Sequence, residues 1–363
     1  TMSDDFSRVV QDAYREQQKY FGAGHVASDI ANRLSFFLDV NGPSMSVQTA
    51  CSSSAVALHL ARNAIINGEC DYALAGGVNI SVHPGKYLML QDMRVLSPDG
   101  REAAFDEGAN GLVPSEGAGM VLLKDYDQAL ADGDTIYGVI SASSTSHAGT
   151  GAGQFLPNLQ VMAQTAIDAI AGSEIDANDI TYIECHGTGT ALGDPIEMKA
   201  MELAIKNFTQ THRYCALGTK ANFGHMEAAS GICSLIKVLL AMKQGFIAPC
   251  ANLNEVNEVY EQENSPFILP TAMTAWEKGK NGRFNAGINS FGMGGSNVFL
   301  VVSSEPETIR QPEISPGTET LPILFSAAST AQLKHYVQSA IEFFSRSATR
   351  PSPFRDLASP RHN

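Results

Sequence analysis

The chain has 363 residues, of which 44% are hydrophobic and 17% are charged. A chain of this length and composition can bury a large core without disulfide or metal staples, and it is too apolar for a disordered protein. Lys and Arg number 24 against 38 Asp and Glu, which leaves a formal charge of −14. A nucleic-acid backbone would be repelled by this charge, so we expect a folded α/β protein that binds no nucleic acid.

Cysteine usage and hydropathy indicate the compartment. The six cysteines lack the paired spacing of zinc or redox motifs and lie mostly in apolar stretches, which is typical of free thiols in a reducing environment. The N-terminal residues 1–8 are polar, and the longest hydrophobic stretches, such as 235–242, are far shorter than a membrane span. We therefore expect a cytoplasmic chain with no targeting peptide and no membrane segment.

The first third of the chain predicts a strand, a helix and a second strand. Residues 44–47 alternate in polarity, residues 51–67 are apolar at helical spacing, and Gly68 supplies a stop. A buried strand over 72–75 then runs into Gly76 and Gly77. This order is that of an α/β half-domain.

A second cycle repeats this order. A strand is predicted over 136–141, a helix over 158–171 closed by Gly172, and a strand over 180–184. The repetition indicates two similar α/β halves.

Two more helices and a glycine loop follow. Asp194 and Glu197 flank Pro195 and predict a capped helix start, and residues 226–243 predict a largely buried helix that stops before Gly245. Asp194 and Glu197 are interpreted as cap residues rather than reacting acids, whereas Glu227 stays open between surface and site support.

The C-terminal part begins with two β-rich runs. These runs, 284–290 and 297–302, enclose a glycine-rich loop that permits close backbone approach. Beyond residue 303 the composition predicts a proline-containing linker, a strand over 321–325 and an amphipathic helix over 330–345.

Cys51 is the first candidate for chemistry. It lies in the run TACSSS, between a predicted strand and a predicted helix, where free amide N–H groups and the helix dipole would favour a thiolate able to attack a thioester. The alternative is a buried cysteine that only packs.

Two histidines beside glycines are the next candidates. His186 lies in ECHGTGT and His225 in KANFGHME, and each alone would more often be a hydrogen-bonded structural residue than a catalyst. The glycine spacings of residues 22–27 and 187–189 are not embedded in a complete dinucleotide-binding unit, and the sequence has no GxSxG elbow and no zinc-ligand spacing.

Four motifs in order resemble one family. TACSSS, HGTGTALGDPIE, KANFGHMEAASG and NSFGMGGSN together resemble β-ketoacyl synthases, most closely the ketosynthase domains of modular polyketide synthases. The resemblance covers roughly residues 20–305, and the tail from Leu321 resembles the linker subdomain that follows such domains. The motif variants TALGDPIE and GMGGSN resemble those of ketosynthases from assembly lines served by separate (trans) acyltransferases.

The resemblance implies an architecture. It predicts a thiolase-like α/β fold layered α-β-α-β-α, with two related halves that each hold a mixed five-stranded sheet, plus a small C-terminal α/β linker subdomain. The domains would be 1–132 with the nucleophile, 133–304 with both histidines, and 305–363 as the linker subdomain. Such proteins usually pair as homodimers.

The resemblance also implies a reaction. Cys51 would accept an acyl chain from the phosphopantetheine of an acyl carrier protein, with the amides of Cys51 and Met293 as oxyanion hole. His186 and His225 would stabilise the enolate formed when malonyl carrier protein loses CO2, and Lys220 would support the site by charge and hydrogen bonds. No permanently bound cofactor and no metal are expected. Whether the Met293 side chain also gates acyl entry is left open.

The sequence departs from the family at several places. Only fifty residues precede Cys51, which predicts that another polypeptide or a further N-terminal segment completes the first half. Gln48, Ser115 and the pair 298–299 differ from the usual motifs, which bears on acyl specificity and activity. Two alternatives therefore stay open: a ketosynthase that transfers acyl chains without elongating them, and a non-catalytic scaffold that completes a partner.

Overall fold

The computed structural model describes residues 26–150, 156–209, 215–260, 265–305 and 329–347, together with the single residues 9, 153, 325 and 327. The chain divides into two compact units, Thr1–Gln311 and Pro312–Asn363. The first unit carries the sheets and every candidate site residue.

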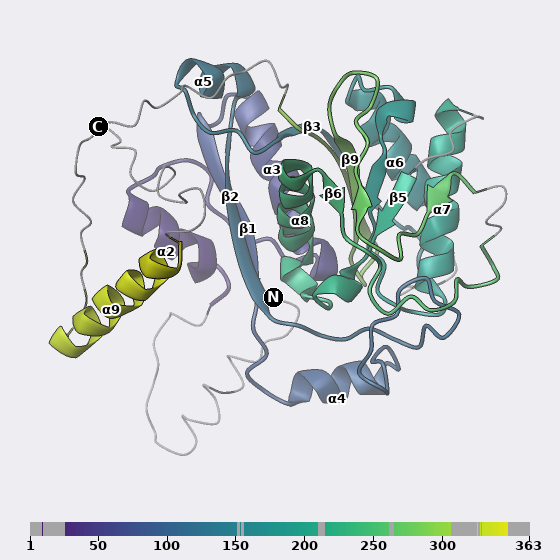
Figure 1. Cartoon of the computed structure of the whole chain (residues 1–363), viewed down its shortest axis with the longest axis horizontal. Coiled ribbons are helices and arrows are strands. Elements are labelled where there is room, and N and C mark those ends of the chain that lie inside the picture. The colour runs from purple at the N-terminus through teal and green to yellow at the C-terminus, as the bar shows by residue number, and fades with distance from the viewer. Residues whose placement is uncertain are drawn as a thin grey trace. The chain divides into compact units, whose positions relative to one another are not determined.

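The helices and strands alternate along much of the chain (Figure 1). The helices are α2 (Asp29–Leu38), η1 (Ala50–Ser52), α3 (Ser53–Ile66), α4 (Gly85–Asp92), α5 (Tyr126–Ala131), α6 (Leu159–Gly172), η2 (Ala177–Asp179), α7 (Gly193–Phe208), η3 (Lys220–Asn222), η4 (Glu227–Ala229), α8 (Ser230–Gln244) and α9 (Thr330–Ser347). The strands are β1 (Tyr72–Asn79), β2 (Gly117–Lys124), β3 (Val139–His147), β4 (Tyr182–Glu184), β5 (Cys215–Gly218), β6 (Phe246–Ile247), β7 (Phe267–Ile268), β8 (Thr274–Ala275), β9 (Asn285–Phe291) and β10 (Ser296–Ser303).

A mixed six-stranded sheet forms the centre of the first unit. Its strand order is β3-β10-β9-β4-β5-β7, with β4, β5, β7 and β9 parallel and β10 antiparallel to both β3 and β9. Strands β1 and β2 form a separate antiparallel pair in the register Leu74↔Leu122, and β6 pairs with β8. In the described residues the larger sheet therefore has six strands, and the sheet of the first half has two, where five were expected in each.

Helices lie between and outside these sheets. Helices α3 and α8 lie between the β1–β2 pair and the six-stranded sheet, and α6 and α7 pack on its other face (Figure 1). Within the described residues this gives a β-α-β-α order, which is four of the five layers predicted.

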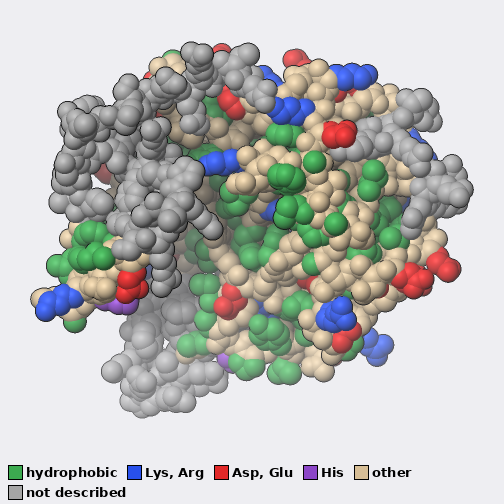
Figure 2. All heavy atoms as spheres, viewed as in Figure 1, with side chains coloured by type: hydrophobic (Ala, Val, Ile, Leu, Met, Phe, Trp, Pro, Cys, Tyr) green, Lys and Arg blue, Asp and Glu red, His purple; other side chains and the backbone are tan. Residues whose placement is uncertain are grey.

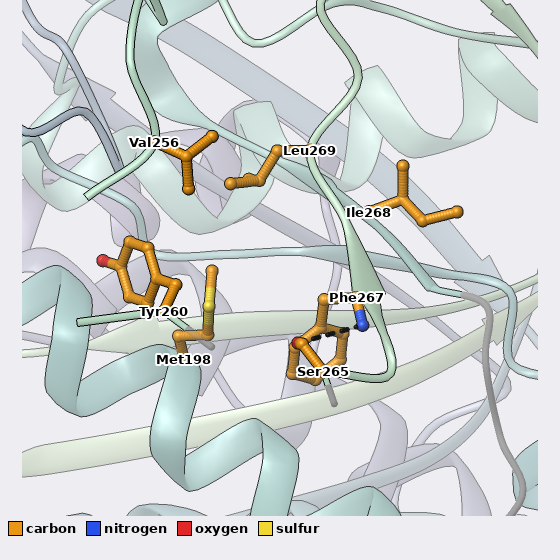
Figure 3. A pocket seen from close by; sticks show the side chains of 7 residues that line it. All are labelled: Met198, Val256, Tyr260, Ser265, Phe267, Ile268 and Leu269. Carbon is orange, nitrogen blue, oxygen red and sulfur yellow. Dashed lines mark hydrogen bonds between the residues drawn. The ribbon is translucent and has the colours of Figure 1, made fainter. Parts of the chain in front are cut away.

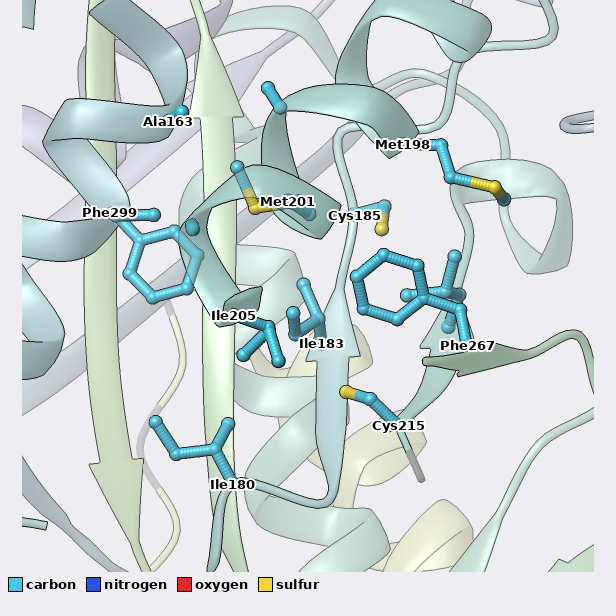
Figure 4. Packing of buried hydrophobic residues seen from close by; sticks show 14 of the residues in the cluster. Ala163, Ile180, Ile183, Cys185, Met198, Met201, Ile205, Cys215, Phe267 and Phe299 are labelled. Carbon is cyan, nitrogen blue, oxygen red and sulfur yellow. The ribbon is translucent and has the colours of Figure 1, made fainter. Parts of the chain in front are cut away.

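Two apolar cores hold these layers together. Ala55 and Leu58 of α3 and Leu235 of α8 pack with the inward residues of both sheets. The second core fills the space between the six-stranded sheet and α6 and α7, with Phe299 and Met201 among its buried members (Figure 4). Strands β4 and β5 are buried along their whole length, as expected for parallel strands covered on both faces.

The outward face of the β1–β2 pair is apolar and exposed. Leu74, Met120 and Leu122 are 43%, 52% and 52% exposed, whereas Leu123 and Val121 on the opposite face pack on the core of α3 and α8. Elsewhere, on the face seen in Figure 2, the Lys and Arg side chains of the described residues lie among acidic ones instead of gathering in one patch.

Most of the predicted helices are confirmed. Helices α3, α6 and α8 lie within a few residues of their predicted bounds, and the predicted stops Gly68 and Gly245 have φ values of 72° and 70°. The predicted strand over 44–47 is wrong, because these residues are irregular and pair with no other strand that the structure describes. Strand β1 extends through Gly76 and Gly77 to Asn79, because the missing Cβ of Gly76 lets Gly119 of β2 approach.

The second unit is described for one helix. Helix α9 confirms the amphipathic helix predicted over 330–345. The predicted linker and the strand over 321–325 fall almost entirely outside the described residues.

Candidate active site

Cys51 lies at the sharp turn that begins α3. The residue before it, Ala50, has a φ of 54°, a left-handed conformation that L-residues rarely adopt. Ser52 and Ser53 close the turn, because their hydroxyls donate to the carbonyls of Thr49 (2.8 Å) and Ala50 (2.6 Å). The turn therefore fixes the direction of the Cys51 side chain.

His225 contacts the Cys51 sulfur directly. Its Nε2 lies 3.2 Å from Cys51 Sγ, although the two residues are 174 positions apart in the sequence. The backbone N–H of Glu227 donates to His225 Nδ1 at 3.3 Å, and Ser230 Oγ lies 2.9 Å from the same atom. Because Nδ1 accepts a backbone N–H, a neutral His225 carries its proton on Nε2 and directs it at the reacting centre.

His186 presents its ring in the same way. Lys220 Nζ lies 3.2 Å from His186 Nδ1, and the backbone N–H of Phe291 donates to that nitrogen at 3.4 Å. Lys220 also donates to the His186 carbonyl oxygen. Since both neighbours of Nδ1 are donors, the proton of a neutral His186 is also on Nε2.

The two imidazoles lie against each other. Their ring centroids are 5.3 Å apart and the rings are nearly perpendicular, at 87°. The structure thus brings Cys51, His186, His225 and Lys220 together from three segments that are distant in the sequence. The arrangement therefore places one sulfur nucleophile beside the Nε2 atom of His225, with the second imidazole packed against the first.

The glycine loop between β9 and β10 completes the surroundings of the sulfur. A Cβ on Gly292 would lie 2.3 Å from the Thr49 carbonyl oxygen, so only glycine lets this loop pack on the nucleophile turn. The backbone amides of Met293 and Cys51 both hydrogen-bond the thiol and lower its pKa. Two backbone N–H groups are therefore directed at the Cys51 sulfur.

Burial dominates the ionisation of the site. Desolvation, followed by the charge of Glu227, raises the pKa of the Cys51 thiol to about 12, although Lys220 and the two amides act in the opposite direction. The amide N–H groups and Lys220 favour a thiolate, but the loss of hydration outweighs them. Burial and then Lys220 lower the pKa of both His186 and His225, so both rings are neutral donors.

Asp194 and Glu197 do not cap α7, and this prediction is wrong. Helix α7 begins at Gly193, and its start has no side-chain cap. The Asp194 carboxylate accepts the N–H groups of Phe105, Thr188 and Gly189 instead.

Glu197 serves the same loop. Its carboxylate accepts the N–H groups of His186 (2.6 Å) and Gly187 (2.8 Å), and Asn289 donates to it as well. The two acids therefore hold the loop that carries His186. Buried amides of a glycine-rich loop need acceptors, which is the sequence signal that could have indicated this role.

Sequence reasoning missed one further acid near the site, Glu102, and left the role of another, Glu227, open. Glu102 is 3% exposed, and it accepts the N–H of Val113. Burial raises its pKa to about 8. Glu227, which stayed open, is buried and pairs with Lys86. Neither role has a local sequence signal, because each partner is distant along the chain.

The described part of the chain offers no metal site and no membrane-spanning helix, and its cavity lies apart from the candidate residues. No group of three or more His, Cys, Asp or Glu there could hold a metal ion. No helix there is both long and apolar enough to traverse a bilayer. A cavity of about 290 Å³, lined by residues that include Met198, Tyr260 and Phe267, contains none of the four candidate residues (Figure 3).

Comparison with known proteins places the chain in a class of α/β condensing enzymes. The family model "Beta-ketoacyl synthase, N-terminal domain" matches residues 2–129, and "Beta-ketoacyl synthase, C-terminal domain" matches residues 137–254. The chain therefore belongs to the β-ketoacyl synthase family.

The most similar relatives include polyketide synthases. Polyketide synthase ThaG of Burkholderia thailandensis is 45% identical over 76% of this chain, and polyketide synthase PksL of Bacillus subtilis is 41% identical over 78%. The chain spans only 5% and 6% of the length of these two relatives.

Two solved ketosynthases share its fold, which is thiolase-like. The ketosynthase from module 6 of the bacillaene synthase of Bacillus subtilis 168 matches with a TM-score of 0.83 and 37% sequence identity. The match covers 92% of this chain and 58% of the ketosynthase chain. An oxazolomycin ketosynthase domain from Streptomyces albus JA3453 has a TM-score of 0.82 and 34% identity, and covers 94% of this chain and 59% of its own.

Proposed function

We propose that the chain acts as a ketosynthase of a polyketide assembly line. Its substrates would be an acyl thioester and a malonyl thioester, each carried by an acyl carrier protein. The observation that carries this proposal is that His225 Nε2 lies 3.2 Å from the Cys51 sulfur while the His186 ring lies 5.3 Å, centroid to centroid, from the His225 ring. Cys51 is the acylated nucleophile, the two histidines stabilise the enolate, and Lys220 supports them. As part of the same proposal, we assign the chain to an assembly line whose acyltransferases are separate proteins.

The first half-reaction is an acyl transfer. The Cys51 sulfur attacks the carbonyl of an acyl-phosphopantetheine thioester, whose oxygen is held by the amides of Cys51 and Met293. The bond to the pantetheine sulfur breaks, and the thiol proton ends on that departing sulfur. Because burial raises the pKa of the Cys51 thiol, proton loss accompanies the attack.

The second half-reaction is a decarboxylative Claisen condensation. The malonyl carrier protein loses CO2, and the electron pair of the broken C–C bond forms an enolate whose oxygen accepts both Nε2–H groups. The enolate carbon attacks the acyl carbonyl, and the Cys51 thiolate leaves and takes a proton from water. The product is a β-ketoacyl carrier protein. The only cofactor is the phosphopantetheine that each carrier protein brings.

The organisation of the chain is part of this proposal. Residues 1–132 form the half with the nucleophile, 133–304 the half with both histidines, and 305–363 the linker subdomain. We propose a cytoplasmic homodimer whose partners are acyl carrier proteins. The likeness to polyketide ketosynthases supports these assignments.

Intact mass measurement tests the first half-reaction. An N-acetylcysteamine acyl thioester should add one acyl group to the protein, and Cys51→Ala should accept none. A wild-type protein that stays unmodified would favour the non-catalytic scaffold.

Addition of malonyl carrier protein tests the second half-reaction. We expect release of CO2 and a β-ketoacyl product, both lost in His186→Ala. Acylation without either product would make the chain a transferring, non-elongating ketosynthase.

A further inference from the structure

A buried ion pair lies beside the site and takes no part in the reaction described above. Lys86 of α4 is 1% exposed and Glu227 of η4 is 2% exposed, and Lys86 Nζ lies 2.6 Å from Glu227 Oε1. Lys86 also donates to Ser81 Oγ at 2.6 Å and to Asn79 Oδ1 at 3.4 Å. Burial of such a pair costs desolvation energy on both partners, so its presence is weak evidence for stability alone.

The backbone of Glu227 links this pair to His225. Glu227 has a φ of 43°, a left-handed conformation that a non-glycine residue keeps only when its surroundings enforce it. From this position its N–H donates to His225 Nδ1. The segment η4 packs against η1, which carries Cys51, and against β1. An anchor on the Glu227 side chain therefore acts on the turn that orients the imidazole.

We propose that Lys86 and Glu227 are positioning residues: their ion pair fixes the turn over residues 225–227 and thereby holds His225 as an Nε2–H donor toward Cys51. This inference rests on the proposed function, which it deepens by assigning a role to two residues that do not touch the reacting atoms. It accounts for a strained backbone and a buried pair at the same place.

The charges of the pair also act on the site in opposite directions. The carboxylate of Glu227 raises the pKa of the Cys51 thiol, whereas Lys86 lowers the pKa of His225. Lys220 is the other charged group that acts on both. At the sulfur the charge of Glu227 outweighs that of Lys220, so loss of Lys86 would leave this carboxylate without its partner and upset the balance.

Site-specific alkylation measures this effect without any substrate. We would follow iodoacetamide labelling of the Cys51 peptide by mass spectrometry as a function of pH. Lys86→Met leaves an uncompensated carboxylate and should lower labelling at pH 8 by about tenfold, the effect of one pKa unit. The isosteric Glu227→Gln should increase it, and the double variant should return it toward wild type.

Condensation assays measure the positioning itself. Glu227→Gln and the double variant should form β-ketoacyl product about 10²-fold more slowly, the usual scale for a displaced proton donor. Lys86→Met should also slow condensation, and Lys86→Arg, which keeps the charge, should recover most of that loss of rate. Lys237→Met is the matched control, because it breaks another largely buried pair, with Glu184. It should lower the unfolding midpoint but leave the labelling profile unchanged.

Two outcomes separate the possibilities. If Lys86→Met and Glu227→Gln shift only the unfolding midpoint, with labelling and condensation as in wild type, the pair is structural and the inference is wrong. If wild-type protein forms no product, the proposed function fails, while the labelling profiles still test the pair. Lys86→Arg and Glu227→Gln conserve charge or shape, so they provide the test should Lys86→Met fail to fold.

Discussion

Glu197 shows how one side chain can decide the geometry of another. Its two carboxylate oxygens accept the N–H groups of His186 and Gly187, from a position eleven residues along the chain. An ionised carboxylate has no donor, so it can accept from several amides at once. The orientation of the His186 ring therefore depends on a residue that is not in the reaction.

The substitution Glu197→Gln tests this dependence. The glutamine NH2 group would face an N–H donor, and an unsatisfied buried donor costs about 1–3 kcal/mol. We expect an equal fall in the free energy of unfolding, measured in urea, and a larger loss of condensation than of Cys51 acylation. Glu202→Gln, on the same helix but in pairs with partly exposed lysines, should change neither. Equal losses in both variants would contradict the role of Glu197.

Two buried acids predict how stability varies with pH. Burial raises the pKa of Glu102 to about 8 and that of Asp194 to about 7, from ordinary values of 4.5 and 3.8. Between the ordinary and the raised pKa, the unfolded chain releases a proton that the folded chain keeps, so stability falls as pH rises. The contribution is complete below about pH 4 and is lost once pH passes about 8.

Unfolding in urea at pH 6 and pH 9 measures this contribution. Each group contributes at most about 1.4 kcal/mol for each pH unit within its window. Glu102→Gln removes one titrating group and should flatten the pH dependence relative to wild type. A variant with the same slope as wild type would show that Glu102 is ionised in the folded protein.

At the scale of elements, local signals located most of the helices but predicted a strand over residues 44–47 that these residues do not form. Gly68 and Gly245 end their helices with left-handed backbones, and this preference belongs to glycine itself. Residues 44–47 have strand-like alternation, but a strand needs a neighbour to pair with, and that neighbour is not encoded in the segment.

Asp194 has the local sequence pattern of a helix cap. Its carboxylate oxygens instead accept the N–H groups of Phe105 and Thr188, which the tertiary fold brings near.

Candidate site residues were predictable to the extent that motifs carry them. Cys51, His186, Lys220 and His225 lie in motifs that resemble one family, and the structure places them together. Lys86 lies in no such motif, because its role depends on a contact with a residue 141 positions away. Contacts of that kind follow from packing rather than from local sequence.

The glycine loop between β9 and β10 gives the clearest test of an element. In Gly292→Ala the new methyl group would collide with the Thr49 carbonyl at 2.3 Å and Ser52 Oγ at 2.8 Å, which pushes the Met293 amide away from the sulfur. We expect Cys51 acylation to slow by about 10²–10³-fold, the usual effect of losing one oxyanion donor. Gly294→Ala is the matched control, since nothing lies within 4 Å of its added Cβ. Similar rates in both variants would exclude the Met293 amide as a donor.

At the scale of the whole first unit, the β1–β2 pair has one packed and one exposed face. The antiparallel register places Leu74 opposite Leu122 on the exposed face, while Leu123 faces the core. Contiguous exposed apolar side chains bind hydrophobic dyes and promote association. The composition of the chain gave no sign of this face, because alternation within a strand does not reveal what covers each side.

Charged substitutions distinguish the two faces. Leu74→Lys with Leu122→Lys should lower the fluorescence of the dye ANS and reduce self-association in light scattering, with little change in the unfolding midpoint. Leu123→Lys should unfold the protein, because it would bury an unpaired charge. Unchanged dye binding in the double variant would show that the face is covered in solution.

The left-handed backbone of Ala50 has a consequence for engineering. Glycine adopts this conformation at no steric cost, so Ala50→Gly would relax the turn of the folded chain, although it would also loosen the unfolded one. The methyl group of Ala50 makes the turn before Cys51 stiffer than a glycine would. A stiff turn keeps the Cys51 sulfur in one direction while bulky thioesters bind and leave. Thermostability and catalytic rate should therefore respond differently to this exchange of a single methyl group.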